Sequence, residues 1–183
     1  ESRGLGDVYK RQLLKEELIP RDSPFPLLDP DFKPKEMNSS QGDACKLIRD
    51  FQKQAKFSAI LLQGVTGSGK TEVYLDAVAT ALKNGEQVLV LLPEIALTNE
   101  FFRRVKDRFG AIPAEWHSGV SVAERRRVWK MVGSGGAKLV IGARSALFLP
   151  FMNLGLIIVD EEHDHSYKQE DGVIYNARDM AVL

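Results

Sequence analysis

Apolar runs alternate with amphipathic stretches over most of the chain. The runs FSAILLQG, QVLVLLP, KLVIGA and LGLIIVD are apolar at nearly every position, and AEWH is a shorter and weaker example. Runs of this kind are typical of strands that are buried on both faces of a parallel sheet. We therefore predict strands at 57–64, 87–93, 114–117, 138–143 and 154–160.

Between these runs, apolar residues recur every three or four positions, which is the spacing of one helix face. The pattern predicts helices at 39–55, 73–85, 97–110 and 121–132, and the segment NARDMAVL at the end of the chain also favours a helix. Glycine ends the second and third helices, and a serine and a glutamate form a capping box for the fourth. Strands that alternate with helices indicate an α/β fold with a parallel sheet covered on both faces.

The first 36 residues do not share this pattern. Residues 2–12 resemble a translated sequencing adapter, and residues 20–36 contain five prolines, each of which removes an N–H donor and restricts the preceding residue. We expect 1–36 to be a poorly structured N-terminal segment or linker, with 1–12 artefactual, and 37–183 to form one domain. Because the chain starts at Glu1 and stops inside an apparent helix, we interpret it as an excerpt of a longer protein.

Composition and charge restrict the partners and the cellular location of the protein, but they do not indicate its chemistry. Lysine plus arginine number 25 and so do aspartate plus glutamate, so bulk charge does not favour a nucleic-acid partner. The single cysteine, Cys45, excludes an internal disulfide and a multi-cysteine zinc site. No apolar run approaches the ~20 residues that cross a bilayer, and the N-terminus lacks a signal-peptide core. We expect a cytoplasmic location.

Residues Gly64 to Thr71, GVTGSGKT, match the pattern G-x-x-x-x-G-K-[ST] between a predicted strand and a predicted helix. Gly64, Gly67 and Gly69 let backbone N–H groups turn inward without Cβ clashes, and the following helix directs its positive end at the same place. Such a loop binds nucleotide phosphates. We expect Lys70 to neutralise the β and γ phosphates and Thr71 to ligate Mg²⁺. The remaining members of the predicted phosphate-binding set are Val65, Thr66 and Ser68.

An acidic cluster follows the last predicted strand, in the segment LIIVDEEHD. The carboxyl ends of parallel strands meet at one edge of the sheet, so we expect Asp160 to face the phosphate loop and hold the magnesium ion. Glu161 would accept a proton from the attacking water or orient it, so the predicted catalytic residues are Lys70, Asp160 and Glu161. His163 and His165 lack the further ligands that a dedicated zinc site needs.

The phosphate loop together with the Asp-Glu-Glu-His motif resembles superfamily 2 helicases. The segments GVTGSGKTEVYL, LLPEIALT, WHSGVS, GARSALF and DEEHDHSYKQEDGVIYNARDMAV, spread over residues 64–182, are similar to the primosomal, replication-restart members of that superfamily. The resemblance implies the first RecA-like P-loop NTPase lobe of a motor. It also implies an ATP-dependent 3′ to 5′ DNA helicase that uses ATP and Mg²⁺ and acts on single-stranded and forked DNA.

The resemblance assigns two further residues to the nucleotide. Gln41 matches a glutamine that reads adenine, because a side-chain amide can both donate and accept a hydrogen bond. His163 matches a position that relays the nucleotide state toward DNA.

On the DNA side, the resemblance implies that strand-end segments contact the single-strand backbone through Thr98, Arg144 and Ser145. An aromatic-rich loop would contribute Tyr167, which could stack on bases, and Lys168, which could meet a phosphate. Other interpretations remain open: helix capping for Thr98, a surface ion pair for Arg144, and an ordinary surface loop around Tyr167.

Helicases of this class hydrolyse ATP between two RecA-like lobes, and the second lobe supplies arginines to the transferring phosphoryl group. The resemblance places that lobe, a cysteine-rich zinc region and contacts with primosome and single-strand-binding proteins outside these 183 residues. We therefore expect residues 1–183 alone to bind Mg-ATP weakly and to be nearly inactive.

Two other functions are compatible with the residues themselves. A different P-loop enzyme is one, although a GTPase would carry Asn-Lys-x-Asp for guanine and this sequence does not. A non-enzymatic module that keeps the nucleotide fold for docking is the other. The Arg125-Arg126-Arg127 run lies opposite an apolar helix face, so we interpret it as solvated rather than DNA-binding.

Overall fold

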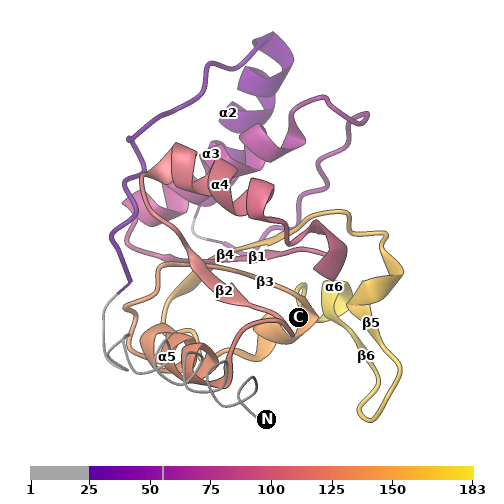
Figure 1. Cartoon of the computed structure of the whole chain (residues 1–183). Coiled ribbons are helices and arrows are strands. Elements are labelled where there is room, and N and C mark those ends of the chain that lie inside the picture. Colours follow the sequence, from indigo (N-terminus) through magenta and orange to yellow (C-terminus); the bar gives the residue numbers. More distant parts are fainter. Residues whose placement is uncertain (1–24, 55) are drawn as a thin grey trace, which may run out of the picture.

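The computed structural model describes residues 25–54 and 56–183, so the predictions for residues 1–24 lie outside the described part. Four parallel strands form one sheet in the spatial order β2-β3-β1-β4 (Figure 1). They are β1 (Gln87–Leu91), β2 (Ala114–Trp116), β3 (Leu139–Gly142) and β4 (Leu154–Val159). The predicted parallel α/β fold is confirmed.

Helices cover both faces of this sheet. α3 (Lys70–Lys83) and α4 (Asn99–Phe109) pack on one face, and α2 (Ser39–Lys53) packs on α3. The other face carries α5 (Val122–Gly133), the short helix η2 (Arg144–Phe148) and α6 (Ala177–Met180), as Figure 1 shows. The chain therefore builds three layers, with the sheet in the middle.

The central strand β1 shows why its sequence is apolar throughout. Val88 and Val90 pack with α3 and α4, whereas Leu89 and Leu91 pack with α5, and all four side chains are fully buried. Because helices cover both faces of this strand, these side chains do not meet water on either face, and apolar residues are favoured at all four positions.

One polar side chain of β1, Gln87, is also fully buried, and all its polar atoms have partners. Its amide donates to the carbonyls of Val132 and Ala137 at 3.0 and 2.8 Å, and its oxygen accepts from the N–H groups of Met152 and Asn153 at 2.9 and 3.1 Å. These bonds fix the end of α5 and the start of β4 to β1.

Helix boundaries follow the expected capping chemistry. Asn38 and Gln41 form a reciprocal capping box at the start of α2, and the Ser121 hydroxyl accepts from Glu124 N at 3.2 Å at the start of α5. α4 ends at Gly110, whose φ of 76° is the left-handed conformation that glycine adopts without strain.

Residues 25–36 contain no helix or strand but lie against the ends of α3 and α4. The Asp29 N–H donates to the Phe109 carbonyl at 2.9 Å, and Arg108 donates to the Pro30 carbonyl at 2.8 Å. Asp31 and Lys83 form an ion pair at 2.6 Å. The described part of the proline-rich segment is thus an ordered connection on the surface.

The prediction of a strand at 57–64 is wrong. The segment pairs with none of the four strands, and Phe57 and Leu61 are 74% and 67% exposed. A strand requires a neighbouring backbone to pair with its N–H and C=O groups, and apolar side chains alone do not supply one. The segment therefore leads into the phosphate loop as an exposed connection.

A short hairpin follows the sheet and projects from its edge (Figure 1). It consists of η3 (His165–Tyr167) and two antiparallel strands, β5 (Lys168–Gln169) and β6 (Tyr175–Asn176). The turn η1 (Glu94–Ala96) connects β1 to α4. Among the described helices, none has the length and apolarity needed to span a membrane.

The different burial of Leu61 and Leu89 gives a direct test of the missing strand. We expect Leu61→Ala to change the free energy of unfolding by less than about 0.5 kcal/mol, because the side chain is already exposed. The matched change Leu89→Ala, at a fully buried position, should cost about 2–5 kcal/mol. Chemical denaturation measures both values. A cost of several kcal/mol at Leu61 would show that the segment packs as a strand after all.

Candidate functional site

The phosphate-loop segment, residues 64–71, folds into a tight turn directly before α3. Gly67 and Gly69 have φ angles of 79° and 84°, a conformation that other residues rarely adopt. A Cβ atom at Gly64 would lie 2.6 Å from the Ser68 hydroxyl, and one at Gly69 would collide with the Gln41 amide. The backbone conformation thus favours glycine at 67 and 69.

Two polar side chains hold this loop in its turned form. The Lys70 ammonium group donates to the Gly64 carbonyl at 2.8 Å, and Gln41 donates to the Ser68 carbonyl at 2.8 Å. The Gln41 oxygen accepts from the Asn38 N–H at 3.0 Å. Gln41 thus uses one amide N–H and one oxygen lone pair within the protein, and its second N–H and second lone pair remain available to a base.

Asp160 follows the last residue of β4, and each of its polar atoms takes part in a hydrogen bond. Its N–H donates to the Leu91 carbonyl at 3.0 Å, and its own carbonyl accepts from the Tyr167 hydroxyl at 2.6 Å. Oδ1 accepts from the Glu161 N–H at 3.0 Å, and Oδ2 accepts from the Tyr74 hydroxyl at 2.9 Å. The carboxylate is thus fixed at the carboxyl ends of β1 and β4.

The bond from Tyr74 links Asp160 to the helix that carries the phosphate loop. Burial raises the pKa of Tyr74, the Asp160 charge raises it further, and a hydrogen bond with Thr71 acts in the opposite direction. The hydroxyl therefore stays protonated and lies beside both Thr71 and Asp160. Tyr74 thus links Thr71 to Asp160, and Lys70 precedes Thr71 at the start of the same helix.

Glu161 and His163 lie at the rim of this site. Glu161 is the one described residue other than glycine with a positive φ, at 49°, so the chain turns sharply directly after Asp160. Its carboxylate lies 3.6 Å from the His163 ring, and both side chains are largely exposed. They are accessible from solvent, as a water-activating acid and a nucleotide sensor would need to be.

The residues present fit a magnesium–nucleotide complex. Mg²⁺ commonly takes only one or two protein oxygens and completes its shell with phosphates and waters. Thr71 and Asp160 supply such hard oxygen ligands beside a loop that only glycine can form. The described residues contain no group of three or more His, Cys, Asp or Glu side chains that could hold a metal ion by themselves.

The predicted DNA contacts are spread over several strand ends. Thr98 caps α4, where its hydroxyl accepts from the Phe101 N–H at 3.2 Å, and the Ser145 hydroxyl accepts from the Trp116 ring at 3.1 Å. Both Thr98 and Ser145 are exposed. Arg144 donates to the carbonyls of Ser166 and Lys168 at 3.1 and 2.7 Å, so it anchors the hairpin rather than forming the surface ion pair considered above.

Tyr167 requires a correction. We predicted that its ring could stack on DNA bases, but the side chain is only 1% exposed. Its hydroxyl donates to the carbonyls of Leu91 and Asp160 at 3.0 and 2.6 Å, and burial raises its pKa. An aromatic residue in a polar segment suggests exposure, whereas here the ring anchors the hairpin to the sheet. Lys168 remains exposed and pairs with Glu170 at 2.7 Å.

Sequence reasoning missed Tyr74 as a site residue. Tyr74 lies at an apolar position of the predicted helix 73–85, and it is buried in the core beside α4 and β1. A signal was nevertheless present, because Tyr74 lies four residues after Lys70 and three after Thr71, which places the three on one helix face. Its polar partner is 86 residues away in sequence.

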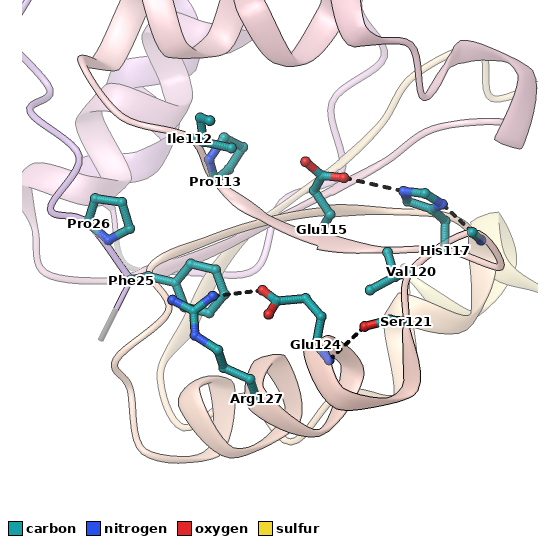
Figure 2. A pocket seen from close by; sticks show the side chains of 11 residues that line it. Phe25, Pro26, Ile112, Pro113, Glu115, His117, Val120, Ser121, Glu124 and Arg127 are labelled. Carbon is teal, nitrogen blue, oxygen red and sulfur yellow. Dashed lines mark hydrogen bonds and ion pairs between the residues drawn. The ribbon is translucent and has the colours of Figure 1, made fainter. Parts of the chain in front are cut away.

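Two hollows lie apart from this site, and no phosphate-loop residue lines either of them. The smaller, of about 370 Å³, lies between β2, α5 and Phe25 (Figure 2). Arg127 there pairs with Glu124 at 2.8 Å and stacks 4.0 Å from the Phe25 ring. The larger, of about 1060 Å³, lies between α4 and residues 32–35 and includes Thr98. The Arg127 side chain is only 12% exposed, so the interpretation of this arginine as solvated is wrong.

Comparison with known proteins defines the class. A profile of the DEAD/DEAH box helicase family matches residues 39–181. The chain therefore belongs to this family, and the helicase resemblance of its motifs is confirmed.

The particular relatives share one name, "Replication restart protein PriA". The protein of Rickettsia felis is 45% identical over 166 residues, which cover 87% of this chain and 26% of that protein. The protein of Bacillus subtilis is 43% identical over 176 residues, covering 96% and 20%. That of Haemophilus influenzae is 53% identical over 127 residues, covering 69% and 17%. The chain spans about a quarter or less of the length of these relatives.

The anchoring role of Tyr167 can be tested by removing its hydroxyl. Tyr167→Phe should lower the free energy of unfolding by about 1–3 kcal/mol, because the Asp160 carbonyl loses its donor whereas the Leu91 carbonyl keeps the Asp160 N–H. Tyr175→Phe is the control, since it keeps the edge-on packing of the ring against Phe148 at 5.0 Å, and we expect a change within about 0.5 kcal/mol. Equal values for the two variants in urea denaturation would rule out the anchor.

Proposed function

We propose that residues 37–183 form the first RecA-like lobe of an ATP-dependent 3′ to 5′ DNA helicase that acts in replication restart and primosome assembly. The observation that carries this proposal is the hydrogen bond from Tyr74 to Asp160. It holds the acidic end of β4 beside the first turn of α3, where Lys70 and Thr71 lie. The names of the relatives support the replication-restart setting.

In this proposal the phosphate loop and Lys70 bind the β and γ phosphates of ATP. Thr71 and Asp160 hold Mg²⁺, which when bound neutralises charge on the phosphate oxygens. Glu161, which is exposed directly after β4, accepts a proton from the attacking water. His163 lies beside Glu161 and senses the nucleotide state. The first two residues of α3, Lys70 and Thr71, therefore bind the nucleotide, and the residues after β4 act on it.

The DNA partner is single-stranded or forked DNA bound across the same ends of the strands. Thr98 follows β1, and Arg144 and Ser145 follow β3, so they are carried by neighbouring parallel strands. Lys168 extends this row on the hairpin that Arg144 anchors. Since total positive and negative charge are equal at 25 residues each, binding depends on these local groups rather than on a general field.

The remaining parts of the function belong to the longer protein that we propose. It acts in the cytoplasm with primosome and single-strand-binding proteins, and any zinc is held outside this chain. A second lobe supplies the arginines for hydrolysis, and such a group contributes about 10³ to 10⁵ in rate. Residues 1–183 alone should accordingly turn over ATP very slowly.

Replacement of Lys70 tests whether the loop drives a motor. In the full-length protein, Lys70→Ala should reduce ATP-dependent unwinding of a forked DNA substrate by at least about 100-fold, because the phosphates lose their main positive partner. Strand-displacement and phosphate-release assays measure this loss.

Lys53→Ala provides the matched control, since Lys53 is an exposed lysine of α2 that pairs only locally with Asp50 at 2.9 Å. Its variant should unwind DNA at the rate of the unchanged protein. Full unwinding by Lys70→Ala would exclude the motor and would favour a module that docks to a partner through the nucleotide fold.

A further inference from the structure

The Tyr74 side chain combines an apolar position with a polar task. Its ring packs in the core cluster of α3, α4 and β1, and the residue is 5% exposed. A phenylalanine would fill the same space. The hydroxyl is therefore not needed for packing. It donates to the carboxylate of Asp160 at 2.9 Å and also forms a hydrogen bond with Thr71.

This hydrogen bond leaves the carboxylate able to bind a cation. Each carboxylate oxygen has two lone-pair sites, and Oδ2 and Oδ1 each use one, toward Tyr74 and toward the Glu161 N–H. A free lone pair thus remains on both oxygens. Donors of this kind commonly orient a metal-binding carboxylate without touching the metal.

The same hydrogen bond also links two elements of the fold. Tyr74 lies on α3, one turn after Lys70 and Thr71, whereas Asp160 lies at the end of β4. The hydrogen bond therefore joins the helix that follows the phosphate loop directly to the end of β4.

We propose that Tyr74 is a positioning residue that presets Asp160 against the phosphate loop, so that a magnesium–nucleotide complex meets an already oriented carboxylate. This inference rests on the proposed function, because it requires Asp160 to bind Mg²⁺. Tyr74 itself contacts neither the nucleotide nor the metal. Removal of the Tyr74 hydroxyl should therefore weaken only the part of the nucleotide affinity that depends on Mg²⁺.

The test measures the affinity of a fluorescent ATP analogue with saturating Mg²⁺ and with EDTA, using this chain and its variants. Tyr74→Phe should leave the dissociation constant in EDTA within about twofold. The tightening that Mg²⁺ produces should fall about 10-fold, as it does when a supporting donor is removed from a metal ligand. Tyr74→Met provides the same measurement if the phenylalanine variant folds poorly.

Two further variants make the result specific. Thr80→Val removes another hydroxyl of α3, one that bonds only to the Asp76 carbonyl at 3.1 Å, and should keep the full magnesium effect. Asp160→Asn should abolish the magnesium effect. The double variant Tyr74→Phe, Asp160→Asn should behave like Asp160→Asn alone, because Asp160 is the group that Tyr74 positions. A further loss in the double variant would assign the effect to the Thr71 contact instead and would overturn the inference.

The outcomes separate this inference from the proposed function. If Asp160→Asn removes the magnesium effect and Tyr74→Phe retains it, Tyr74 is only a packing residue and the positioning role is overturned. If the unchanged chain shows no magnesium effect, or Asp160→Asn keeps it, the assignment of the metal site itself fails. A weaker affinity of Tyr74→Phe in EDTA, equal to that in Mg²⁺, would also overturn the inference.

Discussion

The structure depends on a junction of hydrogen bonds at Asp160. The backbone of this residue continues the pairing of β4 with β1 through Leu91, and its carbonyl receives the Tyr167 hydroxyl. Its carboxylate receives the hydroxyl of Tyr74 from α3. Sheet, hairpin and phosphate-loop helix therefore meet at one residue. Since each buried polar group needs its partner, displacement of any of the three elements would leave an unpaired donor or acceptor in the interior.

Much of this architecture could be predicted because the relevant forces act locally. Apolar runs such as 87–91 must be buried on both faces, and this alone predicts a parallel sheet with helices on each side. Capping at Asn38 and Ser121 involves side chains three residues from their partners, so it can be predicted from the sequence. The phosphate loop is equally local, because its glycines are demanded by two left-handed backbone positions, Gly67 and Gly69.

The failures have the opposite cause, since they concern partners distant in sequence. Apolarity at 57–64 indicates a preference for burial, but a strand also needs a backbone beside it, and no described strand provides one. Tyr167 lies among polar residues, yet its hydroxyl finds the Leu91 carbonyl 76 residues earlier in the chain. Arg144 likewise reaches the hairpin carbonyls across more than 20 residues. Composition of a segment does not contain this information.

Two helices hold the phosphate loop in the described structure. Gln41 of α2 donates to the Ser68 carbonyl, and α3 begins directly after Gly69. That helix is fixed by burial of its apolar face, including Leu75 and Val78, and burial is not directional. A hydrogen bond is directional, so the bond of Tyr74 with Asp160 aligns α3 with the end of β4 in a way that packing alone leaves open.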